Sequence, residues 1–192
     1  MKYMPWITGT QERLILAGIQ ELNDHGYQKF SVRSIAEKCG ISCAAPYKHF
    51  KNKHEYMAAI IGYMHQDWLE TLNGVVAKYQ GFLREQLTHI CIEYIRFLVK
   101  NPYFRSILMQ KDDELDRKYP DLRNCISDST RQLIAAWAKE HDMADDVLQR
   151  KVVIIRAMLY GAALMFDNGE LDYTEENLHI IYKTVDREFD LP

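Results

Sequence analysis

Residues 31–56 read SVRSIAEKCGISCAAPYKHFKNKHEY, and this pattern predicts two short helices joined by a turn. Ser31 is a suitable N-cap for the first helix, and Gly40 can adopt the left-handed conformation that ends it. Ile35 and Phe50 can share an apolar core. Such a pair of helices is typical of a helix-turn-helix, whose second helix enters the DNA major groove with its N-terminal residues at the base edges.

The second of these helices would carry the residues that face DNA. Small side chains near its start would let the backbone approach the bases, and longer polar side chains after them could reach phosphates. The predicted set is Ser42, Cys43, Ala44, Ala45, Tyr47, Lys48 and His49. Lys53 and Ser31 lie at the starts of the two flanking helices, where free N–H groups favour an anion. The same residues could instead form a three-helix structural module with no role in nucleic-acid binding.

Charge is distributed unevenly along the chain. The formal net charge is -3 over 192 residues, but residues 1–56 carry 8 Lys and Arg against 5 Asp and Glu. Residues 57–192 carry 16 basic against 22 acidic residues. The most basic stretch, residues 29–53, has six Lys and Arg and a single acid, Glu37. This composition suits a polyanion footprint, although a solvated charged face has the same composition.

Apolar residues recur at spacings of three and four along the whole chain, which predicts an all-α protein. Thr8 with Gln11, and Asn52 with Glu55, are candidate capping boxes. Pro102 and Pro120 indicate two helix starts, because proline is tolerated at the first helical position. The first predicted helix runs from residue 8 or 10 to residue 25, and the others cover residues 31–40, 42–50, 52–73, 80–100, 102–110, 120–140, 145–166 and 174–189.

Residues 31–56, preceded by ELNDHGY at residues 21–27, resemble the N-terminal domain of the TetR (tetracycline-repressor-like) family of bacterial transcriptional regulators. The segment from Tyr47 to Lys53 is its most specific part. The resemblance implies an all-α chain: a three-helix DNA-binding domain at residues 1–56, and a helical ligand-binding and dimerisation bundle at residues 57–192. It also implies a homodimer that binds a pseudo-palindromic DNA operator, and a ligand that spreads the two heads apart.

The resemblance also implies roles for individual residues. The implied phosphate contacts are Ser31, Tyr47, His49 and Lys53. The implied base contacts are Ser42, Cys43, Ala44, Ala45 and Lys48, with Arg33 as a further candidate in the same groove.

The chain departs from the family pattern at two positions. Cys43 stands where many relatives have Lys, and Pro46 stands where they have an aliphatic residue. Proline lacks an N–H and disfavours helical geometry at the preceding residue. We therefore expect the recognition helix to start late or to be distorted, unless Pro46 lies in its first turn.

Other chemistries fit the sequence less well. Cys39, Cys43, His49 and His54 are spaced C-x3-C-x5-H-x4-H, with too short a gap between the pairs for a common zinc finger, so we expect no metal. Cys43 could be oxidation-sensitive near a helix N-terminus, but we favour the interpretation that it is a small tolerated side chain facing the groove. We find no phosphate-binding loop, dinucleotide motif or nucleophile elbow, so we expect neither an enzyme nor a cofactor.

The last two predicted helices carry a ladder of apolar residues with coiled-coil spacing, which predicts a dimer interface built as half of a four-helix bundle. The predicted interface residues are Leu148, Val152, Ile155, Leu159, Ala162, Phe166, Leu178, Ile181, Tyr182 and Val185. The same ladder could simply close an intramolecular core.

Aromatic residues in the middle of the chain suggest a cavity for an unknown small-molecule effector, although ordinary core packing explains the same residues. The candidate ligand-binding residues are Tyr94, Phe97, Tyr103, Phe104 and Trp137.

We expect a cytoplasmic protein with no membrane contact. The longest apolar run, residues 157–166, is about half the ~20 residues that span a bilayer, and the first ten residues do not form a signal peptide. Four cysteines in a chain of this length indicate a reducing compartment. The expected function is a ligand-responsive, homodimeric repressor that binds an operator in double-stranded DNA. The alternative is an architectural or protein-interaction helical module without a transcriptional ligand response.

Overall fold

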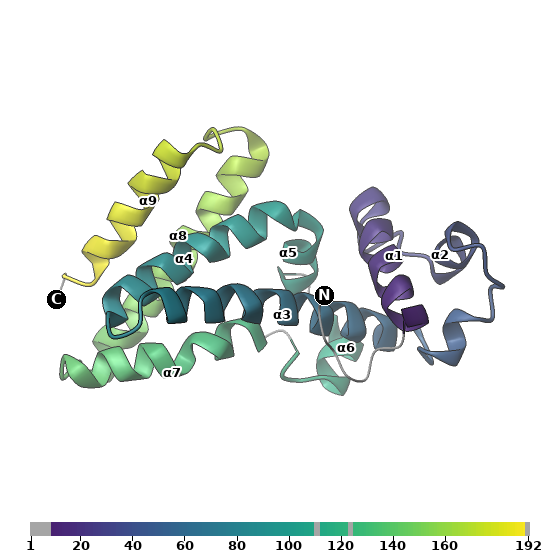
Figure 1. The fold of residues 1–192 in the computed structure, drawn as a ribbon, viewed down its shortest axis with the longest axis horizontal. Helices are drawn as coiled ribbons and strands as arrows, with labels where there is room; N and C mark the ends of the chain where they lie inside the picture. Colours follow the sequence, from purple (N-terminus) through teal and green to yellow (C-terminus); the bar gives the residue numbers. More distant parts are fainter. Residues whose placement is uncertain (1–8, 110–111, 123–124, 191–192) are drawn as a thin grey trace. The chain divides into compact units, whose positions relative to one another are not determined.

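A computed structural model describes residues 9–109, 112–122 and 125–190, and these residues are helical wherever they form regular structure (Figure 1). This finding confirms the predicted all-α fold. The elements are α1 (Gly9–His25), α2 (Val32–Lys38), the 3-10 helix η1 (Pro46–Lys48), α3 (Lys53–Lys78), α4 (Leu83–Lys100), α5 (Pro102–Met109), α6 (Asp113–Lys118), α7 (Cys125–Glu140), α8 (Asp145–Asn168) and α9 (Glu175–Glu188).

The chain divides into two compact units. The first contains Met1–Asp67 and Pro102–Cys125, and the second contains Trp68–Asn101 and Ile126–Pro192. Residues 102–125, which carry α5 and α6, thus group with the N-terminal helices although they are distant in sequence. The domain boundary predicted at residues 56 and 57 stays a prediction.

Local capping explains where several helices begin. The Ser31 hydroxyl accepts a hydrogen bond from the Ser34 N–H (3.3 Å), which confirms Ser31 as the N-cap of α2. At the start of α3, the Asn52 side chain accepts from the Glu55 N–H (2.9 Å), while the Glu55 carboxylate accepts from the Lys51 N–H (3.1 Å). The predicted capping box at residues 52–55 is therefore half formed, because Glu55 reaches Lys51 and not Asn52.

One predicted helix start needs correction, one helix was not predicted, and one predicted cap lies outside the described residues. Pro120 does not start a helix; it lies in a turn closed by a hydrogen bond from the Leu122 N–H to the Tyr119 carbonyl (3.1 Å). Proline at the second position of a turn is common because its φ is already set. Residues 113–118 form α6, which the apolar periodicity did not predict. Thr8, a predicted capping residue, lies outside the described residues.

An aromatic cluster forms the core of the first unit. Tyr56 on α3 is fully buried; its ring stacks on Phe50 at 4.2 Å between centroids and meets Phe30 edge-on at 5.4 Å. The Tyr56 hydroxyl donates to the Leu14 carbonyl of α1, and burial raises the pKa of this phenol. Ile35 of α2 is also fully buried. This core fixes α2 and the following turn against α1 and α3.

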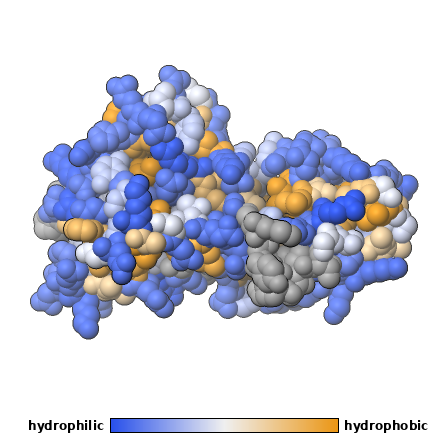
Figure 2. Space-filling model, in the orientation of Figure 1, coloured by the Kyte–Doolittle hydropathy of each residue, from blue (hydrophilic) through white to orange (hydrophobic). Residues whose placement is uncertain are grey.

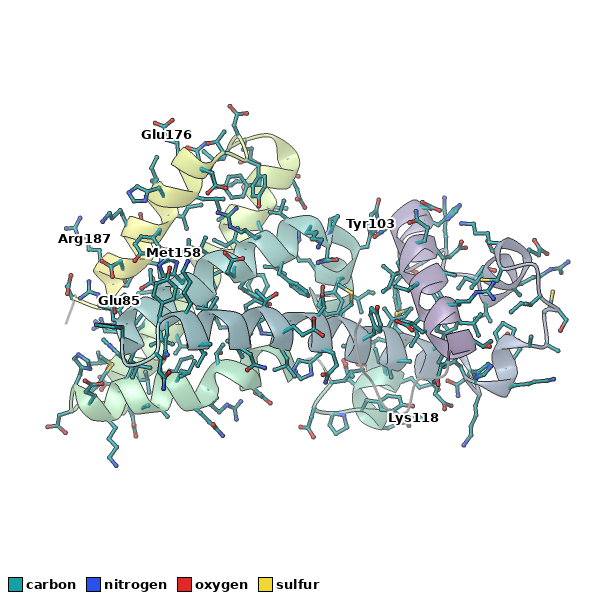
Figure 3. The ribbon with its side chains drawn as sticks, in the orientation of Figure 1. Glu85, Tyr103, Lys118, Met158, Glu176 and Arg187 are labelled. Carbon is teal, nitrogen blue, oxygen red and sulfur yellow. The ribbon has the colours of Figure 1, made fainter. Side chains whose placement is uncertain are left out.

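In the second unit α4 packs against both α8 and α9. The buried apolar side chains that join them are Ile92, Ile95, Leu159, Ala162, Phe166, Leu178 and Val185. Arg84 of α4 also pairs with Asp186 (2.7 Å) and Asp190 (2.6 Å), and these partners raise its pKa. Glu176 and Arg187 lie near opposite ends of α9 (Figure 3).

Hydrophilic residues cover most of the surface in Figure 2, with hydrophobic residues showing between them in patches. Within the described ranges, no helix is long and apolar enough to cross a membrane.

Candidate nucleic-acid interface

The segment between α2 and α3 consists of turns and one short 3-10 helix, η1. Gly40 has a φ of 67°, which ends α2 and redirects the chain. The Ala45 N–H donates to the Ser42 carbonyl (2.9 Å), and Pro46 takes the first position of η1. The predicted helix at residues 42–50 is thus shortened, as expected from a proline that cannot donate a hydrogen bond. Ala45 nevertheless keeps helical angles (φ -62°, ψ -41°) before Pro46.

The predicted base-contact residues lie together on this segment, and several of them are open to a partner. Ser42, Cys43, Ala44 and Lys48 are exposed, whereas Ala45 is half-buried. Pro46 and Phe50 are buried in the core of the first unit and anchor the segment there.

The predicted phosphate contacts differ in their exposure and in the partners that they already have. Tyr47 is 54% exposed, and His49 is half-buried with its ring 6.3 Å from that of Phe50. Ser31 is occupied as the cap of α2, although a hydroxyl that accepts one bond can still donate another. The Arg33 guanidinium is exposed but pairs with Glu37 at 3.2 Å.

Lys38 also belongs to the basic stretch, but its charge is paired with two carboxylates of the same unit. Its ammonium pairs with Glu21 (2.8 Å) and Asp24 (3.0 Å) of α1. Burial of Glu21 would raise its pKa, but hydrogen bonds from Lys38 and Ser34 lower it below the usual value. Lys38 therefore stabilises the packing of α2 on α1. The other lysines of the basic stretch are Lys29, Lys48 and Lys51, which are exposed, and Lys53, which is half-buried.

Lys53 is held by Tyr27, a residue that sequence reasoning did not select. The Lys53 Nζ donates to the Tyr27 carbonyl (3.2 Å) and lies 4.9 Å from the centroid of the Tyr27 ring. Partial burial lowers the pKa of this lysine, and the nearby Asp112 carboxylate acts in the opposite direction. An ammonium has three donors, so this contact leaves capacity for a phosphate.

Asp112, the N-cap of α6, connects the Tyr27 and Lys53 region to residues far along the chain. Its carboxylate accepts from the Leu115 N–H (3.0 Å) and from the Tyr27 hydroxyl, and it lies 3.7 Å from His54. His54 also lies 3.2 Å from Glu114. Tyr27 and Asp112 are 85 positions apart, so no local sequence pattern could have revealed the contact.

The cysteine and histidine pattern does not come together as a metal site. His54 faces Asp112 and Glu114, Cys43 is exposed and Cys39 is half-buried. Across residues 9–109, 112–122 and 125–190, no cluster of three metal-binding side chains is present.

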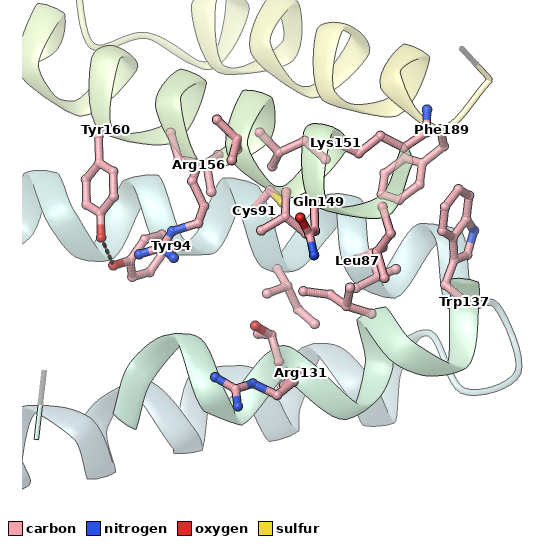
Figure 4. Close-up of a pocket in the computed structure, with 18 of the residues that line it drawn as sticks. Leu87, Cys91, Tyr94, Arg131, Trp137, Gln149, Lys151, Arg156, Tyr160 and Phe189 are labelled. Carbon is pink, nitrogen blue, oxygen red and sulfur yellow. Dashed lines mark hydrogen bonds between the residues drawn. The ribbon is translucent and has the colours of Figure 1, made fainter. Parts of the chain in front are cut away.

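The second unit contains an apolar cavity of about 510 Å³ between α4, α7 and α8 (Figure 4). Two predicted ligand-binding residues, Tyr94 and Trp137, line it. Phe97 is instead buried, with its ring 5.7 Å from that of Trp68. Tyr103 and Phe104 are on α5, in the first unit, and do not line this cavity.

The predicted dimer residues are mostly covered within the monomer. Five of them belong to the core around α4: Leu159, Ala162, Phe166, Leu178 and Val185. Ile181 and Tyr182 pack against that core, and Leu148, Val152 and Ile155 line the cavity. Other apolar residues of α8 and α9 are exposed: Ile154 (37%), Leu164 (50%), Met165 (40%) and Ile180 (58%). We call these four residues the open apolar face.

Comparisons with known proteins agree with this arrangement. Residues 14–60 match the family of bacterial regulatory proteins called the tetR family. The chain is 23% identical over 167 residues to the nucleoid occlusion factor SlmA of Idiomarina loihiensis, which covers 84% of this chain and 81% of the relative.

Two solved structures share the fold. One is the transcriptional regulator FadR of Bacillus subtilis in complex with stearoyl-CoA (TM-score 0.74, 15% identity, 93% of this chain and 96% of that chain). The other is the fatty acid degradation regulator FadR of Bacillus halodurans (TM-score 0.74, 16% identity, 95% of each chain).

A helix-turn-helix unit attached to an all-helical unit with a cavity defines the class of this protein as a DNA-binding transcriptional regulator. The match over residues 14–60 confirms the resemblance to the TetR family that the sequence shows. Regulators of this family are not enzymes.

Proposed function

We propose that the chain is a ligand-responsive repressor that acts in the cytoplasm and binds a pseudo-palindromic operator as a homodimer. The observation that carries this proposal is the exposed segment at residues 42–48, fixed by a buried core and flanked by cations. Ser42, Cys43 and Ala44 allow close approach to base edges, and Lys48 and Lys53 supply phosphate contacts.

The open apolar face is our candidate for the dimer interface. Exposed apolar patches on a soluble protein often mark surfaces that a partner covers. Five residues of the ladder predicted from the sequence already pack against α4, which favours Ile154, Leu164, Met165 and Ile180 as candidates. A two-fold dimer would place two heads on half-sites about 34–36 Å apart, or a multiple of that distance.

The cavity in the second unit is our candidate for the effector site. It has the size of a small-molecule pocket, which typically occupies ~300–1,000 Å³. A FadR relative with the same fold was solved with stearoyl-CoA, which supports a ligand-binding role for this unit. An effector releases DNA only if it binds the spread form better, and a tenfold preference corresponds to ~1.4 kcal/mol.

The experiment that tests this function is a titration of DNA fragments with the purified protein at several salt concentrations. We expect specific fragments to bind and their affinity to fall steeply with salt, because phosphate contacts release counterions. The alternative, an architectural or protein-interaction module, predicts no such specific duplex binding. A compound that occupies the cavity without changing operator affinity would contradict the ligand response.

A further inference from the structure

The walls of the cavity carry positive charge only. Three of the lining residues are cationic, Arg131, Lys151 and Arg156, and none of the described residues lining the cavity is acidic. This is opposite to the charge of the surrounding sequence, since residues 57–192 have an excess of acidic residues. The wall also contains Cys91, but burial raises the pKa of its thiol to about 12, so this side chain is neutral at physiological pH.

The three cations are not equally available. The Lys151 ammonium is buried and donates to the Glu188 carbonyl at 2.6 Å. Arg131 pairs with Asp128 of its own helix at 2.6 Å, and in Figure 4 its guanidinium points away from the other labelled residues. Among the residues that the structure describes, the Arg156 guanidinium has no hydrogen-bond or ion-pair partner.

Arg156 is an exposed residue at the edge of the cavity. Its side chain extends from α8 toward the cavity on the side of Tyr94 and Tyr160 (Figure 4). The hydroxyl groups of these two tyrosines are 3.4 Å apart. One of these O–H groups donates to the other hydroxyl oxygen. The hydroxyl pair and the guanidinium on the same side of the cavity together supply donors suited to a carboxylate or phosphate oxygen.

The remainder of the cavity is apolar. Leu87 and Ile90 of α4, Ile134 and Trp137 of α7 and Val152 of α8 line it. A ligand that fills this region must bury hydrocarbon, because polar groups placed there would lose their hydrogen bonds to water.

We propose that the cavity binds an amphipathic anion, an acyl chain with an anionic head, whose head is held by Arg156 beside the Tyr94 and Tyr160 hydroxyls. The acyl chain lies along the apolar wall toward Trp137. This inference rests on the proposed effector site and specifies its ligand class. A free fatty acid and an acyl thioester of a nucleotide share this chemistry and differ in the size and charge of the head.

Calorimetric titration of the purified full-length chain, without DNA, tests the proposal. The three probes are dodecanoate and dodecanoyl-CoA, each below its critical micelle concentration, and 1-dodecanol below its solubility limit. We expect at least one of the two anions to bind tenfold or more tightly than the neutral alcohol. The comparison of the two anions identifies the head group. Equal affinity for the alcohol and both anions, or no binding of either anion, would overturn the proposal.

Matched arginine variants test the assignment of the head group. Arg156→Gln should weaken binding of the preferred anion by about tenfold, or ~1.4 kcal/mol, without changing the affinity for 1-dodecanol. Arg131→Gln should change anion affinity less than threefold, because Arg131 already has a carboxylate partner. Equal losses in the two variants, or no loss in Arg156→Gln, would contradict the role of Arg156. Circular dichroism verifies that each variant is folded.

The titration separates this inference from the proposed function. Anion binding without any effect on operator affinity would refute the ligand response and leave the ligand class intact. DNA release by a neutral or cationic compound, with no binding of either anion, would refute the ligand class and leave the ligand response intact.

Discussion

The Lys53 ammonium donates a hydrogen bond to the Tyr27 carbonyl at 3.2 Å and lies over the ring of the same residue. Tyr27 in turn donates its hydroxyl to Asp112, the N-cap of α6. A predicted phosphate contact is therefore oriented by the backbone carbonyl and the ring of a residue whose hydroxyl also binds the α6 segment. The position of Lys53 follows from tertiary contacts as well as from its place in the first turn of α3.

Lys53→Ala should weaken binding to all duplex sequences by a similar factor. The slope of log affinity against log salt concentration should become shallower by about one. The reason is that a phosphate contact adds affinity without reading the bases. Lys78→Ala, at the other end of α3, is the matched control and should leave both quantities unchanged. Fluorescence anisotropy with several duplexes at graded salt provides the measurement. A loss confined to one base position would show that Lys53 reads sequence.

Gly18 allows α1 to approach α3 closely, and a methyl group there should destabilise the first unit. A Cβ at this position would lie 2.9 Å from Ile60 Cδ1 and 3.0 Å from a ring carbon of Tyr56, whose hydroxyl is fixed by Leu14. We expect Gly18→Ala to lower the free energy of unfolding by about 1–2 kcal/mol.

Gly62→Ala is the control for this substitution. No atom lies within 4 Å of a Cβ built at Gly62, so alanine should stabilise α3 by about 0.5–1 kcal/mol through its helix propensity. Chemical denaturation measures both variants. Equal stability of the two variants would contradict the close packing at Gly18.

Glu21 should make the first unit sensitive to acid. Its side chain is 2% exposed, and its pKa in the folded state lies below the usual ~4.3 because Lys38 and Ser34 donate to it. The stability that this carboxylate contributes is fully present above pH ~4.3 and is lost as the pH falls through its folded pKa. Glu21→Gln should therefore lower stability at neutral pH and flatten the decline between about pH 5 and pH 3.

Ser34→Ala removes one of the two donors and should flatten the same pH dependence only partly. Urea denaturation across this pH range measures the effect for both substitutions. An unchanged pH slope in Glu21→Gln would show that other carboxylates control the acid response.

Leu164→Glu should separate a homodimer into monomers if the open apolar face is the interface, because it would bury a charge without a partner. Leu164 is 50% exposed on α8. Leu16, 47% exposed on α1, is the matched control, and Leu16→Glu should leave the oligomeric state unchanged. Sedimentation velocity distinguishes the two outcomes. Loss of dimer in both variants, or in neither, would contradict the assignment.

The sequence predicted most helix positions because their signals are local. Ser31, Asn52 and Gly40 act within four residues of the helix ends that they define. The helix α6 was missed because its sequence, DELDRK, has one apolar residue and thus no periodicity. The effect of Pro46 was predictable in kind, since proline chemistry is local, but the final length of η1 was not.

The functional surfaces were less predictable because they depend on which helices meet. Periodicity shows that α8 is apolar on more than one face, but only the packing of α4 shows which face is already covered. Likewise, Tyr103 was grouped with Tyr94 by composition, although α5 belongs to the first unit and α4 to the second. The contact between Tyr27 and Asp112 spans 85 positions and has no sequence signal.

The most direct test of the account is a selection of random duplexes with the purified protein at low salt, followed by sequencing. We expect an enriched inverted repeat whose half-sites are centred about one helical turn apart, or a multiple of it. An enriched single half-site would contradict the dimeric arrangement. Recovery of no duplex above background would contradict the central claim that residues 31–53 form a DNA-binding surface.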